Sequence, residues 1–224
     1  MIITIDGPAG AGKSTAAKLL AQLLGFDFLD TGAMYRAVTL AALRANVDLY
    51  DQAALARLLA TLGLVLSGHR VVMNGEDITS LIRTAQITAA SGPIAASPVV
   101  RQRLVEWQRQ IAAGRNVVSE GRDQGTVVFP DAECKFFLIA DPVERARRRL
   151  RELQARGESA TFEEVLAAQQ VRDTRDAARD IGPMLPAADA IQLDSTHLTI
   201  DEMVTRMERE IRRRGSPPKM AKKP

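Results

Sequence analysis

The stretch Gly7-Pro8-Ala9-Gly10-Ala11-Gly12-Lys13-Ser14 decides the fold of this chain. It fits the phosphate-binding loop (P-loop) pattern G-x-x-x-x-G-K-S/T. The apolar, β-branched run from Met1 to Ile5 predicts a buried strand ahead of the loop. Behind the loop, apolar residues at helical spacing predict an amphipathic helix: Ala16, Leu19, Leu20, Leu23 and Leu24. The alternative is a glycine-rich turn that only joins strand to helix, but these flanks favour nucleotide binding.

Such a loop binds phosphate mainly through its backbone. Glycines let successive N–H groups turn toward one point, where the N-terminus of the following helix adds partial positive charge. We expect Lys13 to reach the β- and γ-phosphates as a catalytic residue, and the Ser14 hydroxyl to ligate Mg²⁺. The expected nucleotide-binding residues are Gly7, Pro8, Ala9, Gly10, Ala11, Gly12, Lys13, Ser14 and Thr15.

The length of 224 residues is enough for one sizeable α/β domain with an insert. Hydrophobic residues make up 46% of the chain, which is enough for a full core. The single cysteine, Cys134, excludes a disulfide framework and a cysteine metal site, and is expected to be a core residue on a strand. We expect no signal peptide, and no apolar run reaches the roughly 18 residues of a membrane span. These features favour a cytoplasmic protein without a membrane partner.

The formal net charge is only +3, so position matters more than the total. The tail carries the only basic run: Arg212, Arg213, Arg214, Lys219, Lys222 and Lys223. A tether to nucleic acid or membrane is one interpretation of this run. We favour a disordered, solvated end, and expect no nucleic-acid partner.

The remaining chain alternates strands with helices, which predicts an α/β, three-layer P-loop NTPase fold: a five-stranded parallel sheet with helices on both faces. After the first strand, the predicted strands are 26–30, 116–119, 135–139 and 190–193. Two apolar runs within 64–75 flank a Ser-Gly turn and predict a β-hairpin with His69 at its tip. Ser91-Gly92-Pro93 and Ser97-Pro98 are predicted to break helices.

Three charged segments are candidate ligand sites. The run Glu120-Gly121-Arg122-Asp123 directly follows a predicted strand, where open α/β sheets bind ligands. Arg101 continues the inward-facing stripe of another predicted helix, where a charged side chain is costly unless it has a partner. That partner is either a bound anion or acceptor, or a carboxylate of the protein in an internal ion pair, and the sequence leaves both alternatives open. Another predicted helix carries one carboxylate among three guanidinium groups at positions i, i+3, i+4 and i+7: Arg172, Arg175, Asp176 and Arg179. This charged face is either a ligand site or a plain stripe of ion pairs.

The triplet Asp30-Thr31-Gly32 also matches the aspartic protease motif. We reject that interpretation, because those enzymes bring two such carboxylates together in an all-β setting. Here a single triplet lies within a βα pattern. Arginines are dense between Arg145 and Arg156, whereas a purely solvated helix would usually mix signs more evenly. Partial neutralisation by bound phosphates is the functional interpretation of this helix.

Three motifs resemble bacterial cytidylate kinases. Residues 30–36 are similar to that family's D-S/T-G-A-x-Y-R segment, with Thr31 where many relatives have serine. Residues 121–130 resemble its G-R-D-x-G-T-V-V-F-P run, and residues 172–176 its R-D-x-R-D helix. The resemblance extends from residue 2 to about 212. Glu120 stands where some relatives have aspartate, so we assign it no metal role from the resemblance.

The resemblance implies a nucleoside-monophosphate-kinase fold that transfers the γ-phosphoryl group of ATP, with Mg²⁺, to CMP or dCMP. It implies a core of residues 1–50, 84–141 and 181–214, a monophosphate-binding insert of 51–83, a helical lid of 142–180 and a disordered tail of 215–224. The resemblance implies catalytic roles for Lys13, Arg122 and Arg179. The implied substrate-binding residues are Thr31, Tyr35, Arg36, Ser91, Arg101, Arg122, Asp123, Arg172, Asp176 and Arg179.

Two other interpretations stay open from the sequence. The first alternative is another small-molecule kinase of the same fold, such as an adenylate- or shikimate-kinase relative. The second is a non-enzymatic P-loop module that uses its basic tail. The specific later motifs favour a kinase whose partners are the nucleotides ATP, CMP and dCMP, and we expect it to be a cytoplasmic monomer. Phosphoryl transfer needs positioning and charge more than a covalent nucleophile, and the arginines supply charge.

Overall fold

A computed structural model describes residues 1–68, 70–155 and 157–215. His69, Arg156 and the predicted tail beyond Gly215, with its three lysines, lie outside the described residues. The chain divides into two compact units, and β2 contains the junction between them. The first unit comprises Met1–Phe28 with the described residues from Arg115 onward, and the second comprises Leu29–Gly114. The predicted insert of 51–83 lies within the second unit, and its boundaries stay a prediction.

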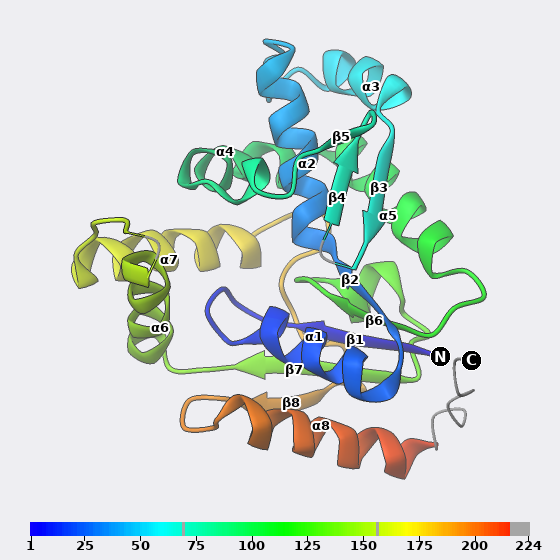
Figure 1. The fold of residues 1–224 in the computed structure, drawn as a ribbon, viewed down its shortest axis with the longest axis vertical. Coiled ribbons are helices and arrows are strands. Elements are labelled where there is room, and N and C mark those ends of the chain that lie inside the picture. The colour runs from blue at the N-terminus through cyan, green and yellow to red at the C-terminus, as the bar shows by residue number, and fades with distance from the viewer. Residues whose placement is uncertain (69, 156, 216–224) are drawn as a thin grey trace. The chain divides into compact units, whose positions relative to one another are not determined.

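The predicted five-stranded parallel sheet is confirmed (Figure 1). Its strands are β1 (Ile2–Asp6), β2 (Asp27–Asp30), β6 (Val117–Glu120), β7 (Cys134–Ile139) and β8 (Ile191–Asp194). The order β2-β6-β1-β7-β8 places β1 in the centre. Ile5 lies opposite Glu120 in the register, so the P-loop after β1 and the segment after β6 leave the same edge of the sheet.

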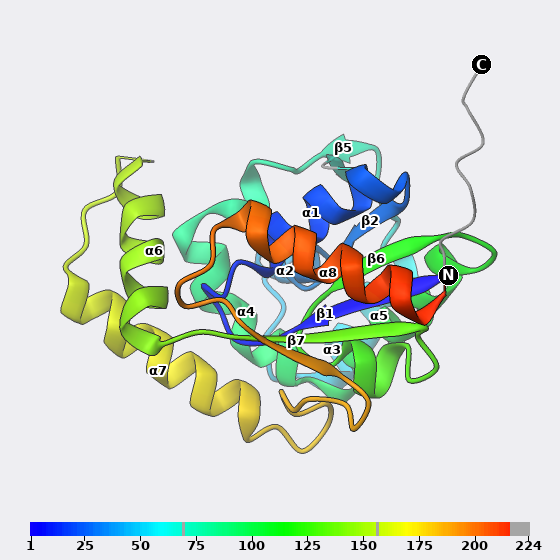
Figure 2. The same ribbon diagram turned by 90° about the horizontal axis from the view of Figure 1, so that it is seen from below.

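One face of the sheet packs an apolar core against two helices, α1 (Lys13–Leu24) and α8 (Ile200–Arg214). These helices lie side by side in Figure 2. The buried stripes of α1 and α8 meet Ile3, Ile5 and Phe136 of the sheet, and Cys134 is part of this core, as expected. A capping box between Thr199 and Glu202 starts α8, as the sequence predicts.

Buried polar groups line the other side of the central strands within the first unit. The short π-helical turn η2 (Gln124–Val128) contacts β1 there. The Asp6 carboxylate accepts from the Gln124 and Gly125 N–H groups at 2.9 and 2.8 Å. The Ser119 hydroxyl bonds to Gln124 Oε1 at 2.7 Å, and Lys135 Nζ pairs with Asp189 at 2.9 Å. Hydrogen bonds between buried polar groups thus help to place the segment after β6.

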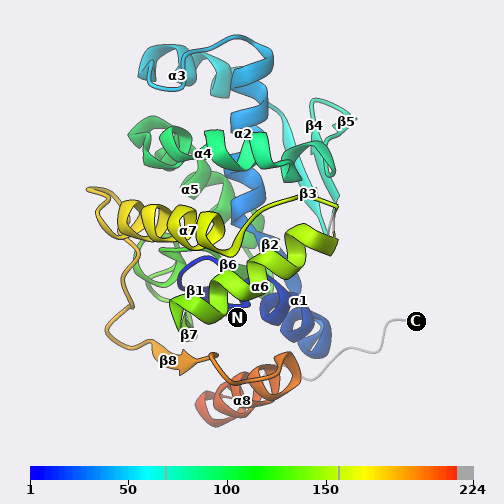
Figure 3. The same cartoon turned by 90° about the vertical axis from the view of Figure 1, so that its left-hand side faces the viewer.

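Helices α6 (Pro142–Ala155) and α7 (Phe162–Ala177) pack on one another (Figure 3). The Asp141 carboxylate accepts from the Val143 and Glu144 N–H groups and caps α6. The sequence predicts that this second helix runs on to about Arg179, and α7 ends close to that point, at Ala177. The Ala178 N–H still bonds to the Thr174 carbonyl, and the chain then leaves the helix.

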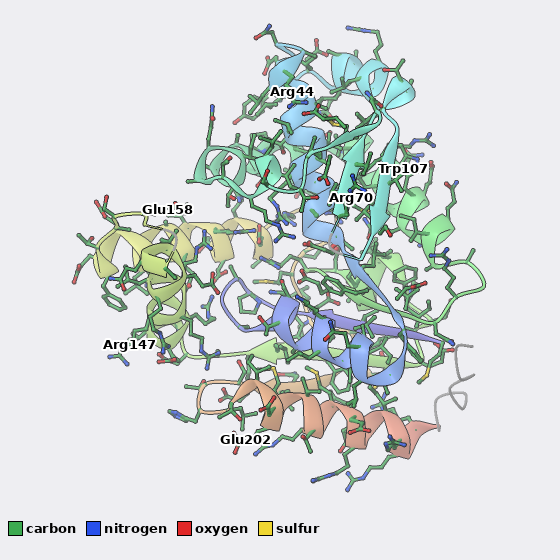
Figure 4. The ribbon with its side chains drawn as sticks, viewed as in Figure 1. Arg44, Arg70, Trp107, Arg147, Glu158 and Glu202 are labelled. Carbon is green, nitrogen blue, oxygen red and sulfur yellow. The ribbon has the colours of Figure 1, made fainter. Side chains whose placement is uncertain are left out.

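The second unit joins a helical group to a small antiparallel sheet. Its elements are α2 (Thr31–Arg44), α3 (Gln52–Thr61), β3 (Leu64–Ser67), β4 (Arg70–Met73), β5 (Glu76–Asp77), η1 (Leu81–Arg83), α4 (Ala85–Ala96) and α5 (Pro98–Ala112). The predicted hairpin is confirmed, with Leu64 opposite Met73. Arg44 and Arg70, labelled in Figure 4, pair with carboxylates of β5. No helix in the described ranges is both long and apolar enough to span a membrane.

The predicted helix break at Ser91-Gly92-Pro93 is wrong, because all three residues lie inside α4. Proline in a helix removes one N–H donor and crowds the preceding turn. Burial of Gly92 and Ile94 compensates for this local cost through tertiary packing. The break at Ser97-Pro98 is confirmed: the Ser97 hydroxyl caps α5, and Pro98 occupies its first turn.

We predict that Asp6 makes stability fall between about pH 4 and pH 7. Burial raises the pKa of Asp6 from 3.8 to about 7, despite the two backbone N–H bonds that lower it. In this window the unfolded chain releases the proton that the native state retains, so rising pH favours unfolding. Asp6→Asn should flatten this part of the pH profile of unfolding free energy, measured by denaturant titration. The exposed Asp131→Asn is the control, and parallel Asp6→Asn and wild-type profiles would contradict the prediction.

Candidate functional site

Close packing around two glycines fixes the path of the P-loop. A Cβ atom on Gly7 would lie 2.2 Å from the Leu138 carbonyl oxygen, and one on Gly10 would lie 3.0 Å from the Arg145 carbonyl oxygen. Both glycines also have positive φ angles, 135° and 78°. Only glycine fits at such positions without strain, so the loop pattern in the sequence has a steric cause.

Lys13 is buried at the start of α1, where its Nζ donates to the Pro8 carbonyl at 2.6 Å. Burial lowers its pKa well below the usual value, and the positive charge of Arg122 and then of Arg172 lowers it further. The carboxylates of Glu120 and Asp6 oppose this shift. Lys13 therefore shares its surroundings with two guanidinium groups, an arrangement that favours a bound anion.

The Ser14 hydroxyl donates to Glu120 Oε1 at 2.7 Å. Glu120 is buried at the end of β6, beside the central strand that carries the P-loop. A hydroxyl and a carboxylate are the hard oxygen ligands that Mg²⁺ prefers, and Mg²⁺ sites usually combine one or two such groups with phosphate oxygens. The sequence placed Glu120 in a candidate ligand segment without a metal role, and only the fold shows its contact with Ser14.

Asp176 is buried and gathers arginines from two segments of the first unit. It accepts from Arg122 Nε at 3.1 Å and pairs with Arg179, while Arg172 Nε lies 3.8 Å away. Arg175, on the same helix, is 4.0 Å from the carboxylate. Asp176 is thus a common partner of several guanidinium groups. The structure thus joins the charged α7 segment to the segment after β6, which the sequence treated separately.

Asp123 is also buried, and it follows Arg122 directly. The two backbone bonds from Gln124 and Gly125 to Asp6 anchor the segment just after it. Asp6 therefore links the end of β1 to the segment that carries both Arg122 and Asp123. Asp6 was not among the expected site residues, and no spacing rule pointed to it.

Within the second unit, Asp30 caps α2 and pairs with two arginines. Its Oδ1 accepts from the Ala33 N–H at 2.8 Å, while its Oδ2 lies 3.4 Å from Arg36 and 3.6 Å from Arg83. A Cβ atom on Gly32 would lie 3.0 Å from the Arg36 guanidinium. Arg83, in η1, is a second cation here that sequence reasoning missed, since nothing in its local sequence marks it.

The other expected substrate residues of the second unit lie on α2, α4 and α5. Thr31 and Arg101 are buried, and Tyr35 is half-buried. Arg101 Nη1 donates to the Ala95 carbonyl at 3.4 Å, and the Ser91 hydroxyl donates to the Thr88 carbonyl at 2.8 Å. The inward direction predicted for Arg101 is therefore confirmed by its burial.

Each unit thus collects its own share of the expected residues. The first brings together Lys13, Ser14, Arg122, Arg172, Asp176 and Arg179 through the contacts above. In the second, Thr31, Tyr35 and Arg36 share α2, whereas Ser91 and Arg101 belong to the next two helices, α4 and α5.

Comparison with known proteins gives consistent matches along the chain. The cytidylate kinase family pattern matches residues 3–213. A cytidylate kinase from Geobacter sp. (strain M21) is 50% identical, covering 96% of this chain and 94% of that protein. One from Caldanaerobacter subterraneus is 48% identical over 94% of each chain, and one from Haemophilus ducreyi is 44% identical, covering 91% and 93%.

Solved structures with low sequence identity share the fold. A crystal structure of a Thermus thermophilus protein aligns with a TM-score of 0.51 at 20% identity, covering 96% of this chain and 98% of that one. An uncharacterized protein from Eubacterium ventriosum aligns with a TM-score of 0.52 at 14% identity, covering 95% and 98%. The match over nearly the full length and the close relatives show that this chain belongs to the cytidylate kinase family.

Proposed function

We propose that the chain transfers the γ-phosphoryl group of ATP to CMP or dCMP in a Mg²⁺-dependent reaction, as a cytoplasmic monomer. The observation that carries the proposal is the cluster of cations around Lys13. Arg122 and Arg172 act on its pKa and also share the single Asp176 carboxylate. A transferring phosphoryl group spreads negative charge over its oxygens, and such a cluster stabilises that charge.

The P-loop binds the phosphates of ATP through its backbone N–H groups, and Lys13 follows the γ-phosphate into the transition state. Arg122, Arg172 and Arg179 orient the acceptor phosphate and sugar, and Asp176 keeps their guanidinium groups in register. No residue acts as a covalent nucleophile, because the acceptor phosphate attacks directly. The remaining task of the protein is to align the two nucleotides and exclude water.

Ser14 and Glu120 would hold Mg²⁺, since their oxygens already lie within hydrogen-bond distance of each other. The metal would neutralise phosphate charge and fix the phosphate oxygens. Glu120 would also orient the Ser14 hydroxyl, because the carboxylate accepts a hydrogen bond from that hydroxyl.

The residues that the family motifs imply would recognise the acceptor. Arg36 would bind its phosphate, helped by Thr31 and Tyr35 on the same helix. Cytosine offers an amino donor at position 4 and acceptors at positions 2 and 3. Asp123 would accept from the amino group, while Arg101 would donate to the ring acceptors and Ser91 would contact the base. Both charged side chains are buried, so a wrongly paired base would leave an unsatisfied group.

A substrate panel tests the function directly. ATP consumption would be measured with CMP, dCMP, UMP, AMP and shikimate at equal concentrations and saturating Mg²⁺. CMP and dCMP should be the preferred acceptors. Faster turnover of AMP or shikimate would assign the chain to another reaction of the same fold, and tail-dependent RNA binding without any kinase activity would favour a non-enzymatic module.

Lys13→Ala should lower kcat at least about 100-fold, the scale of losing one preorganised electrostatic group. The substitution removes an ammonium that is already desolvated, so its interaction with the transferring phosphoryl group is strong. Steady-state kinetics with ATP and CMP measure the effect. Near-normal turnover would remove Lys13 from the mechanism.

Glu120→Gln should raise the Mg²⁺ concentration for half-maximal activity about 10-fold, the lower end for losing a metal-orienting partner. The glutamine keeps the size of the side chain but not its charge. Activity would be titrated against Mg²⁺ at fixed ATP, with the exposed Glu106→Gln as control. An unchanged Mg²⁺ profile would make Glu120 a purely structural partner of Ser14.

Asp123→Ala should lower kcat/KM for CMP far more than for UMP. Each mispaired buried group costs about 1–3 kcal/mol, so wild-type discrimination through two groups reaches about a hundredfold. The variant loses one of them, and the CMP-to-UMP ratio should shrink. Equal losses for both substrates would show that Asp123 is a scaffold or phosphate-site residue.

A further inference from the structure

Arg145 connects three segments of the first unit. Its guanidinium is buried in the first turn of α6, with a side-chain exposure of 7%. Nε donates to the Ala140 carbonyl at 3.1 Å, and Nη1 donates to the Ala9 carbonyl in the P-loop at 3.0 Å. Nη1 also donates to Asp173 Oδ2 of α7 at 2.5 Å. The sequence suggested a bound phosphate for the arginines of this helix, but Arg145 bonds to two carbonyl groups and a carboxylate of the protein instead. No role in the proposed function uses this residue.

The bond to Ala9 affects the direction of a backbone amide. Within a trans peptide, the C=O of one residue and the N–H of the next point in opposite directions. Holding the Ala9 carbonyl toward Arg145 therefore points the Gly10 N–H to the opposite side. The contact is close, because a Cβ atom on Gly10 would lie 3.1 Å from the Arg145 Cβ. Arg145 thus sets the orientation of one P-loop peptide.

Asp173 links the same guanidinium to α7. It lies four residues after Gln169, so both side chains leave the helix on one face. Gln169 Nε2 donates to the Pro142 carbonyl at 3.1 Å, which gives α7 a second bond to the first turn of α6. Asp173 directly follows Arg172, which interacts with Asp176 and Lys13. A displacement of α7 therefore acts on Arg145 and on the arginine cluster together.

The other arginines of α6 do not make this connection. Arg147 is exposed, and Figure 4 shows it pointing outward from α6. Arg149 pairs with Glu152 of the same helix at 3.0 Å, and this pair is considerably more exposed than Arg145–Asp173. The Arg149–Glu152 pair provides a matched ion pair on the same helix without a bond to the P-loop among the contacts described.

We propose that Arg145 and Asp173 are positioning residues that couple the placement of α7 to the orientation of the Ala9–Gly10 peptide. Asp173 holds the Arg145 guanidinium, and Arg145 aims the P-loop amide. A movement of α7 over bound nucleotide would then also align the P-loop. This inference rests on the proposed phosphoryl transfer and adds two residues to it.

The test compares Asp173→Ala, Asp173→Asn and the control Glu152→Gln. Asp173→Ala should raise the KM for ATP about 10-fold, within the range typical of coupling between sites. Asp173→Asn keeps an acceptor for Arg145 and should restore most of the affinity, while Glu152→Gln should match the wild type. Simple loss of folded enzyme would lower apparent kcat and leave the KM for ATP unchanged.

Hydrogen exchange supplies a readout that does not depend on the acceptor. In the wild type, amides of residues 162–177 should exchange more slowly when a non-hydrolysable ATP analogue with Mg²⁺ binds. This response should disappear in Asp173→Ala. If that variant does not fold, Arg145→Lys replaces it, because a lysine ammonium cannot reproduce the fixed fork that bonds Ala140 and Ala9 together.

An unchanged KM for ATP together with a retained exchange response would overturn the proposal. A wild type that does not phosphorylate CMP, but whose α7 responds to the ATP analogue only when Asp173 is present, would overturn the proposed function and leave the coupling in place. The two failures are therefore distinguishable.

Discussion

The site depends on a buried lysine ammonium held among guanidinium groups. Lys13 lies at the start of α1, and the charges of Arg122 and Arg172 are near enough to lower its pKa. Concentrated positive charge in a desolvated place is unfavourable unless an anion offsets it. Glu120 and Asp6 offset only part of it. The first unit is therefore arranged for a polyanionic ligand, and its family membership agrees with this requirement.

The surrounding scaffold keeps the P-loop in shape through its carbonyl groups. Lys13 holds the Pro8 carbonyl, Arg145 the Ala9 carbonyl and Ser195 the Ala11 carbonyl. These three bonds come from α1, from α6 and from the segment after β8. Because the bonds belong to the protein itself, the amide directions are set before nucleotide binds. Such preorganisation avoids reorganisation at the moment of reaction, which is a main source of catalytic power.

Features fixed by local sequence could be predicted. The P-loop, the order of strands and helices, the hairpin and the helix caps all follow from spacing or from residues within one turn. The break predicted at Pro93 failed because tertiary packing overrides the local preference of proline within α4. The helical spacing of apolar residues predicted the burial of Arg101. Its partner could not be predicted, because the partner depends on the tertiary structure.

The contacts that combine distant segments could not be predicted from spacing alone. Glu120 meets Ser14 across 106 residues, and Arg122 meets Asp176 across 54. The strand order β6-β1 creates the first contact, and the path of α7 within the first unit creates the second. A sequence motif indicates which residues are charged, but only the fold shows which carboxylate they share.

Proton uptake on nucleotide binding tests the central claim most directly. Calorimetric titration of ATP with Mg²⁺ across a series of pH values, in buffers of different ionisation enthalpy, gives the number of protons taken up. An anion placed against Lys13 raises its lowered pKa, so the wild type should take up protons and Lys13→Ala should not. Binding of equal affinity without proton uptake, in both proteins, would contradict the account.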